Sequence, residues 1–366
     1  MEIGIVGLPK SGKTTVFNAL TKGKAETGVY APAAAGPNVG VTKVPDPRLE
    51  FLEKIFHPKR KVPAEVTYVD VAAPPKSLGK GEGIAGQFLA QLSKMDALLH
   101  VVRAFEDARV PHMESSIDPE RDIATMDLEL AFSDLAIIER RLERIETSLK
   151  AAKPHEREAY SREQALLARL KTALEGERPV RELQLTEDEK RITSNYQFLT
   201  AKPLLVVFNT GEEMLSEASS LEEKWRTKHQ RPQVQVAVLC AKLEMELSQL
   251  EDADAQQFRS SMGLEEAALN RMIAISYELL GLISFFTVVS NEVKAWTIHR
   301  DTPAVKAAGK IHSDMEKGFI RAEVVSYDDL VKCGSIAETR KRGLLHVEGK
   351  NYIVRDGDVI TFLFNV

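Results

Sequence analysis

The chain has 366 residues, of which 43% are hydrophobic and 28% are charged, with a formal net charge of −5. This composition is typical of an ordinary soluble protein with two or three domains, and the net charge gives no general attraction for nucleic acid, although basic runs at 59–61 and 340–342 leave a local contact open. The absence of a long apolar run excludes a membrane-spanning helix, and two cysteines, Cys240 and Cys333, are too few for a disulfide framework or a tetrahedral zinc site, so we expect both to be reduced.

The strongest motif lies at the N-terminus. Residues 2–6 are predicted to form a buried strand, which leads directly into the run Gly7-Leu8-Pro9-Lys10-Ser11-Gly12-Lys13-Thr14 and then into a helix from Thr15 to Leu20. A strand, a glycine-rich turn and a helix in this order form a phosphate-binding loop. Its backbone N–H groups surround a polyphosphate while the lysine adds a positive charge. We therefore predict a nucleotide site, with Thr14 placed to ligate Mg²⁺.

Apolar segments rich in β-branched residues recur between helical patterns. Near-continuous hydrophobic runs of this kind suit strands of a parallel sheet that is covered on both faces, which predicts an α/β nucleotide-binding domain. Ligands of such sheets bind beyond the carboxyl ends of the strands, where Asp70, His112, Asn209 and Cys240 follow in this sequence. The predicted strands are residues 3–6, 66–69, 98–102, 204–208 and 234–239.

A different pattern separates the third and fourth of these strands. From Leu128 to Leu149, apolar residues recur at alternating spacings of three and four, which predicts a long amphipathic helix. The chain breaks at Lys153-Pro154 and resumes helically through Leu174, and a third helix is predicted to start at the capping box from Thr186 to Glu189. We expect an antiparallel helical hairpin inserted into the sheet domain. It either packs only on itself or binds a partner, and its apolar seam closes within one chain or between two.

Short strands separated by turns dominate the chain from about residue 283. Gly349-Lys350 and Asp356-Gly357-Asp358 are predicted turns between the last strands. We expect a small α+β module to close the chain. Its predicted strands are residues 285–288, 293–298, 321–325, 344–347 and 359–364.

Several long motifs resemble the Obg-like ATPase (YchF) family, P-loop NTPases of the TRAFAC class. They are the phosphate-binding loop, the runs 36–41 and 44–49, the segments 80–83 and 87–89, and the run 307–324, which is similar to the start of that family's TGS domain. The likeness extends over the whole chain. It implies an α/β P-loop NTPase domain with a mostly parallel sheet (1–125 and 201–282), an inserted antiparallel α-helical coiled-coil hairpin (126–200), and a C-terminal α+β, ubiquitin-like TGS domain (283–366).

The base-binding loop is where the family differs from ordinary GTPases. Guanine-specific proteins place an Asp at the end of an Asn-Lys-x-Asp loop, where it accepts hydrogen bonds from two guanine donors. This chain has Asn209-Thr210-Gly211-Glu212 instead, and the run Cys240-Ala241-Lys242 matches the family's Ser-Ala-Lys loop with Cys in place of Ser. The resemblance implies a preference for ATP over GTP, with Asn209 orienting the loop and the base.

The resemblance also assigns the remaining roles in the site. Lys13 and the loop histidine His112 are the candidate catalytic residues, and Thr14 and Asp70 are the candidate Mg²⁺ ligands. The residues expected to bind ATP are Pro9, Lys10, Ser11, Gly12, Lys13, Thr14, Thr15, Asn209, Thr210, Gly211, Glu212, Cys240 and Ala241.

Two positions depart from the family's pattern and bear on hydrolysis. Ala34 stands where a switch threonine usually completes the Mg²⁺ shell, and the Asp-x-x-Gly motif ends in Ala73, followed by two prolines that restrict the turn. Phosphoryl transfer relies mainly on positioning and charge neutralisation, so slow ATP hydrolysis is still expected. The alternatives are a nucleotide-binding module with little or no hydrolysis, and a GTPase in which Glu212 takes the role of Asp.

The resemblance implies the ribosome as partner. The contact would involve the large subunit or ribosomal RNA, through the helical hairpin and the TGS domain, and would make the protein a nucleotide-dependent switch. Because residues 1–6 begin as a strand and not as a basic segment ahead of an apolar one, we expect no leader peptide, no membrane contact and a cytoplasmic location. We expect a monomer or a weak dimer.

Overall fold

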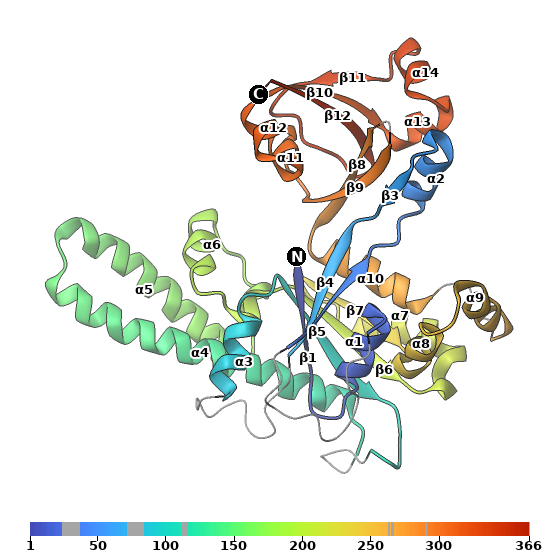
Figure 1. Cartoon of the computed structure of the whole chain (residues 1–366). Helices are drawn as coiled ribbons and strands as arrows, with labels where there is room; N and C mark the ends of the chain where they lie inside the picture. Colours follow the sequence, from blue (N-terminus) through green and yellow to red (C-terminus); the bar gives the residue numbers. More distant parts are fainter. Residues whose placement is uncertain are drawn as a thin grey trace. The chain divides into compact units, whose positions relative to one another are not determined.

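The structure is a computed structural model of the chain, and it describes residues 1–23, 37–71, 84–110, 116–262, 264, 267–289 and 291–365. The chain divides into two compact units. The first contains residues 1–40 and 67–269, and the second contains residues 41–66 and 270–366. Figure 1 follows the chain through the elements of both units.

The first unit is built on a sheet of six described strands in the order β2-β4-β1-β5-β6-β7. Neighbouring strands from β4 to β7 run parallel. The predicted α/β class and the five predicted strands are therefore confirmed, and β6 is buried along its whole length, as a strand covered on both faces should be. The strands are β1 (Glu2–Val6), β2 (Asn38–Lys43), β4 (Glu65–Asp70), β5 (Ala97–Ala104), β6 (Leu204–Thr210) and β7 (Val234–Leu239).

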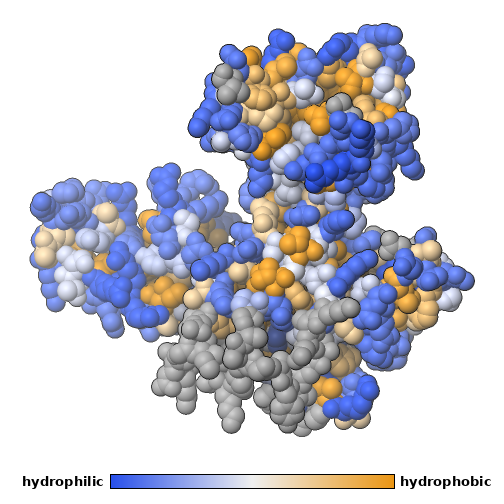
Figure 2. Space-filling view, in the orientation of Figure 1, coloured by the Kyte–Doolittle hydropathy of each residue, from blue (hydrophilic) through white to orange (hydrophobic). Residues whose placement is uncertain are grey.

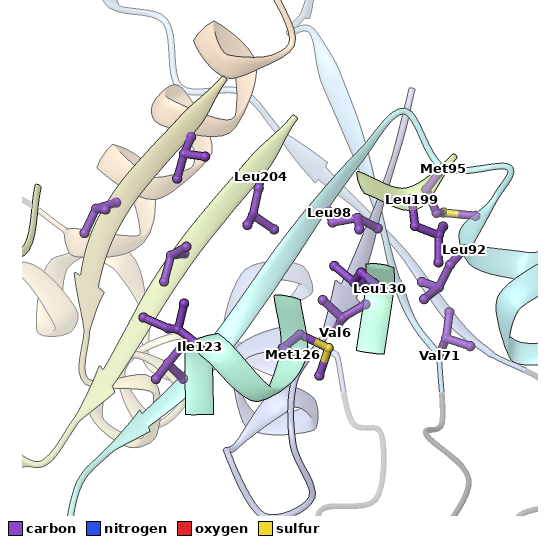
Figure 3. Close-up of a cluster of buried hydrophobic side chains, with 14 of the residues drawn as sticks. Val6, Val71, Leu92, Met95, Leu98, Ile123, Met126, Leu130, Leu199 and Leu204 are labelled. Carbon is purple, nitrogen blue, oxygen red and sulfur yellow. The ribbon is translucent and has the colours of Figure 1, made fainter. Parts of the chain in front are cut away.

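Helix α4 (Pro119–Ala151) packs its first turns on one face of this sheet. Its residues Ile123 and Met126 share a hydrophobic cluster with Leu98 and Val102 of β5 (Figure 3). Since side chains alternate along a strand, His100 lies on the same face between these two residues. Outside the helical insertion, the other helices of this unit are α1 (Lys13–Thr21), α3 (Ile84–Leu92), the 3-10 helix η3 (Glu212–Glu217), α7 (Ala218–Lys228), α8 (Ala241–Leu247) and α9 (Asp252–Ser261), while α10 (Ala268–Leu279) leads into the second unit.

The predicted helical hairpin is present. Helix α4 continues beyond the sheet and α5 (Pro154–Glu175) returns beside it after a two-residue link (Figure 1). Ile138, Ile145 and Leu170 are fully buried in the seam, as the three-four spacing predicts. The third helix, α6 (Glu187–Ser194), begins at the predicted capping box, and the short 3-10 helices η1 (Val180–Glu182) and η2 (Leu199–Ala201) complete the insertion.

A buried carboxylate ties the hairpin to the chain that returns to the sheet. Asp134 of α4 has no exposed surface and accepts hydrogen bonds from Leu199 N at 2.9 Å, Thr200 N at 2.8 Å and Thr200 Oγ1 at 2.6 Å. Burial raises the pKa of Asp134 to about 6, although these hydrogen bonds act to lower it. The carboxylate thus replaces water for the N–H groups at the start of η2.

The second unit contains a mixed sheet of six described strands in the order β11-β10-β12-β8-β9-β3. Strand β12 pairs with β10 antiparallel and with β8 parallel, and α11 (Ala304–Ile311) supplies three buried alanines to the core. This is the predicted α+β module. Its remaining elements are β8 (Leu282–Val289), β9 (Glu292–His299), α12 (Ser313–Lys317), β10 (Phe319–Ser326), α13 (Tyr327–Cys333), α14 (Ile336–Lys341), β11 (His346–Glu348) and β12 (Asp358–Phe364).

One predicted strand of this module is displaced. Strand β11 begins at His346 and not at Leu344. The reason is the end of α14, where Gly343 adopts a φ of 70° and Leu344 N donates to Thr339 O at 2.9 Å. This hydrogen bond holds Leu344 in the helix-terminating turn and leaves fewer residues for the strand.

Residues 41–66 belong to the second unit, although the predicted boundaries place them within 1–125. They form α2 (Pro47–Phe56) and β3 (Arg60–Val62), and β3 adds a parallel edge strand beside β9. Arg48 of α2 binds Asp356 at 2.7 Å and stacks over the Phe286 ring. A segment early in the sequence thus completes the C-terminal sheet.

Charges of both signs are mixed on the surface. On the face shown in Figure 2, hydrophilic residues predominate and apolar residues form separate small groups. The basic runs are paired in part: Lys61 binds Glu50 and Glu53, and Arg340 and Arg342 bind Glu323 and Glu338. Within the described ranges no helix is both long and apolar enough to cross a bilayer, and both cysteines are free.

Candidate functional site

The turn after β1 has the backbone shape that its glycines allow. Gly12 has a φ of 96°, and Lys10 also lies in the left-handed region with a φ of 67°. At Gly7 a Cβ atom would lie 2.5 Å from Val101 O, so only glycine permits β1 and β5 to approach so closely here. Gly12 is also the N-cap of α1 and offers no side chain to cap the helix, which leaves the first N–H groups of α1 directed at the turn.

The Lys13 ammonium folds over the turn that precedes it. Its Nζ donates to Gly7 O and to Leu8 O, each at 3.0 Å. Burial lowers the pKa of Lys13 to about 8, while the nearby Asp70 carboxylate opposes the shift. A phosphate group that replaced the two carbonyl groups would favour the charged form, so this ammonium is placed to respond to an anion.

Thr14 and Asp70 bring two hard oxygen donors together. Thr14 Oγ1 donates to Asp70 Oδ2 at 2.9 Å, joining the first turn of α1 to the end of β4. Asp70 is buried, with 5% of its surface exposed. Hydroxyl and carboxylate oxygens are ligands that suit Mg²⁺, and the pair therefore fits such an ion.

Asn209 connects the turn to the loops on its far side. Its Nδ2 donates to Ser11 O at 3.0 Å, and its Oδ1 accepts from Ala241 N at 3.1 Å. A Cβ atom on Gly12 would lie 2.3 Å from Asn209 Nδ2, so the absence of a side chain there is a requirement of this contact. Within the described chain, the buried hydroxyl groups of Ser11 and Thr210 beside Asn209 have no hydrogen-bond partner.

The two loops that follow β6 and β7 are joined by an ion pair. Lys242 Nζ lies 2.8 Å from Glu212 Oε1, and both side chains are about half exposed. Cys240, by contrast, is buried with 3% of its surface exposed, and burial raises the pKa of its thiol. A Cβ atom on Gly211 would overlap the Glu213 carboxylate, which lies against the loop backbone.

Sequence reasoning missed two residues that lie beside this cluster. Phe105, just after β5, has its Cε1 atom 4.0 Å from the Cβ position of Gly12. Arg103 is buried, donates from Nε to Phe105 O at 3.2 Å, and stacks its guanidinium 4.5 Å above the Phe105 ring. The only sequence signal was their position at the carboxyl end of a predicted strand.

The structure thus brings most of the predicted site residues to one edge of the sheet. Pro9 is exposed in the turn and Thr15 is half-buried in α1. His112 lies outside the described residues, as do Ala34 and Ala73. The arrangement offers N–H groups, an ammonium, paired oxygen donors and an aromatic ring, which together suit a nucleotide.

Comparisons with known proteins agree with this chemistry. Residues 2–138 match a family model described as "50S ribosome-binding GTPase", and residues 282–365 match the YchF-GTPase C-terminal model, described as "Protein of unknown function". The chain is 41% identical to "Ribosome-binding ATPase YchF" of Bacillus subtilis (strain 168), over all of both chains. It is 40% identical to the protein of that name in Escherichia coli O157:H7, over 100% of this chain and 99% of the relative.

A solved structure extends the likeness to the fold. The Schizosaccharomyces pombe YchF GTPase superposes with a TM-score of 0.86 at 30% identity, and the match covers 99% of this chain and 97% of that one. Both the sequence and the fold therefore match along the whole length.

Proposed function

This chain belongs to the YchF family, and on that premise we propose that it is an Mg²⁺-dependent ATP-binding protein that hydrolyses ATP slowly and acts as a nucleotide-dependent switch on the ribosome or translation machinery. The observation that carries the nucleotide site is the convergence of Lys13, the Thr14 and Asp70 pair, and Asn209 at one end of a parallel sheet. Residues 9–15 would surround the phosphates through their N–H groups and the Lys13 charge.

The two oxygen donors would hold the metal ion. Thr14 would bind Mg²⁺ directly, and Asp70 would bind it directly or through a water molecule. When bound, Mg²⁺ neutralises charge on the phosphate oxygens of the nucleotide. In the described structure Asp70 accepts the Thr14 hydroxyl, so the same carboxylate orients the threonine that would be a ligand.

The base would lie between the two loops that Asn209 connects. Thr210, Gly211, Glu212, Cys240 and Ala241 would line it, and Phe105 would offer its ring to the base. Adenine is the favoured base because the loop lacks the free Asp that accepts two hydrogen bonds from guanine.

Hydrolysis would depend on His112 and Lys13. Lys13 would neutralise charge on the transferred phosphoryl group, and His112 would orient the attacking water. Ala34 and Ala73 would keep the turnover slow.

The proposed contact surface and location of this chain follow from its family. We propose that the large subunit or its RNA is the contact, through the hairpin of residues 126–200 and the TGS domain of residues 283–366. Action on the ribosome would place the protein in the cytoplasm. The seam of α4 and α5 is filled within one chain by residues such as Ile138 and Leu170, which favours a monomer or a weak dimer.

Phosphate release with Mg²⁺ and ATP or GTP, measured beside equilibrium binding, tests the proposal. The wild type should bind ATP more tightly than GTP and release phosphate slowly. His112→Ala should keep ATP binding and lose most of the release, and Lys13→Met should lose both. Binding of ATP without release above background would favour the binding module with little hydrolysis, and a preference for GTP would favour a GTPase.

A further inference from the structure

An ion pair between Glu212 and Lys242 links the loops that follow β6 and β7. Glu212 follows Gly211 in the loop after β6, and Lys242 lies in the first turn of α8. Their charged atoms lie 2.8 Å apart. Because the loops are the proposed walls of the base site, this contact joins the two walls.

Asn209 alone does not separate adenine from guanine. One hydrogen of its Nδ2 is used by Ser11 O, and its Oδ1 is used by Ala241 N. The remaining hydrogen would reach purine N7, which is an acceptor in both bases. Selection between the bases must therefore come from groups that face the Watson–Crick edge, where the two bases differ. Guanine has an N1–H beside its amino group there, whereas adenine has an unprotonated N1 beside its amino group.

A free carboxylate on this loop would favour guanine. Ionised Glu accepts hydrogen bonds only, so it pairs with two adjacent guanine donors but opposes the lone pair of adenine N1. In the described structure the Glu212 carboxylate is not free, since the Lys242 ammonium binds one of its oxygens. The ammonium compensates the charge and orients the carboxylate toward α8.

We propose that Lys242 is a positioning residue for base selection, which holds the Glu212 carboxylate away from the base and so prevents the loop from accepting guanine. This inference rests on the proposed nucleotide site and adds to it the residue that enforces the choice of base. Lys242 acts through Glu212 and needs no contact with the nucleotide.

The charges around Lys242 maintain the pair. Glu212 raises the pKa of Lys242 by hydrogen bonding and by its charge, Glu246 on the same helix adds to this, and Arg109 opposes it. The ammonium therefore stays charged across the neutral range. Glu213 has its carboxylate against Gly211 instead and, among the described contacts, makes no ion pair with Lys242.

The test is the ratio of GTP to ATP dissociation constants for the wild type, Lys242→Met and Glu212→Gln, with Glu213→Gln as the matched control. Lys242→Met should strengthen GTP binding so that the ratio falls at least about fivefold, in keeping with one bidentate carboxylate contact. Lys242→Arg should restore the wild-type ratio. In the double variant that combines Lys242→Met and Glu212→Gln, the gain in GTP binding should disappear. Glu213→Gln should leave the ratio unchanged.

Two results would overturn the inference. The first is a folded Lys242→Met protein, as judged by its melting temperature, that keeps the wild-type ratio. The second is a gain in GTP binding by Lys242→Met that persists without the Glu212 carboxylate. Either outcome leaves the proposed function standing as long as the wild type prefers ATP. A wild type without that preference would instead contradict the proposed function itself.

Discussion

The Thr14 hydroxyl donates to the Asp70 carboxylate across 2.9 Å, which joins the phosphate-binding turn to the end of β4. The two residues belong to different motifs and lie more than fifty positions apart in the sequence. Both carry oxygen atoms of the kind that Mg²⁺ prefers as ligands. The contact therefore links the part of the chain that would hold phosphate to the strand that leads toward residues 72–83.

Replacing Thr14 by valine tests this pair. Thr14→Val keeps the shape of the side chain and removes the oxygen, so ATP affinity measured with Mg²⁺ should fall about tenfold or more, a loss of about 1.4 kcal/mol. Affinity measured with a chelator should change little. Thr21→Val is the control, because the Thr21 hydroxyl donates to Phe17 O of its own helix. An equal loss with and without Mg²⁺ would contradict a metal-ligand role for Thr14.

The pKa of Lys13 predicts that ATP binding takes up a proton. Burial holds this pKa at about 8 in the nucleotide-free protein, and bound phosphates should raise it. At pH 8 to 9 a fraction of the molecules must therefore gain a proton as ATP binds, and affinity should fall as the pH rises through this range. Titration calorimetry in buffers of different ionisation enthalpy measures the uptake, which should vanish in Lys13→Arg, because a guanidinium keeps its positive charge and does not titrate in this range. Proton uptake that persists in this variant would assign it to another group.

Gly12 should tolerate no side chain. In Gly12→Ala the new Cβ would lie 2.3 Å from Asn209 Nδ2, at a backbone φ of 96° that disfavours alanine. We expect nucleotide binding to be lost while the far-ultraviolet circular dichroism remains that of the wild type. Gly176→Ala is the control, since its nearest contacts lie at 3.5 Å and its φ is ordinary. Undiminished ATP binding by Gly12→Ala would show that the turn relaxes and that the contact with Asn209 is dispensable.

His100 should make stability depend on acid pH. The ring has 1% of its surface exposed, neither nitrogen has a hydrogen-bond partner in the described chain, and burial lowers its pKa to about 4. The unfolded chain takes up this proton near pH 6.5, so stability from the neutral ring is present above pH 6.5 and is lost as the pH falls to about 4, by about 3 kcal/mol in total.

Urea unfolding of the wild type and His100→Leu between pH 7 and pH 4 measures this loss. Asp134 acts in the opposite direction in the same window, because its raised pKa of about 6 makes the folded state bind a proton more tightly. The difference between the two proteins removes that contribution, which they share. Parallel pH profiles would show that His100 does not titrate in this way.

The local features of the fold were predictable because each rests on short-range physics. The capping box at Thr186 and the alternating spacing around Ile138 follow from helix geometry, and both are found as expected. Strand β3 was not predicted, because its three residues gain their structure from pairing with β9, more than two hundred positions away. No local pattern reports such a contact.

In the site, too, locally encoded residues were predictable and residues placed by distant contacts were not. Lys13, Thr14, Asp70 and Asn209 were found because their motifs encode local turns and strand ends, and the structure brings all four together. The stack of Arg103 on Phe105 depends on the conformation of a long side chain at the end of its strand. The sequence around these two residues has no distinctive spacing that would predict it. His100 reads as one more residue of an apolar strand. Its burial on the face that α4 covers, with no hydrogen-bond partner among the described residues, depends on packing between distant segments.

Sedimentation of the protein with ribosomes is the most direct test of a nucleotide-dependent switch. Purified protein would be centrifuged through sucrose with 70S ribosomes and with isolated subunits, in the presence of a nonhydrolysable ATP analogue, ADP or no nucleotide, with Lys13→Met alongside. A nucleotide-dependent switch predicts recovery with ribosomes or large subunits that differs between the ATP analogue and ADP, and a Lys13→Met variant that does not respond to nucleotide. Recovery of the wild type entirely in the ribosome-free fraction in all three conditions would contradict it.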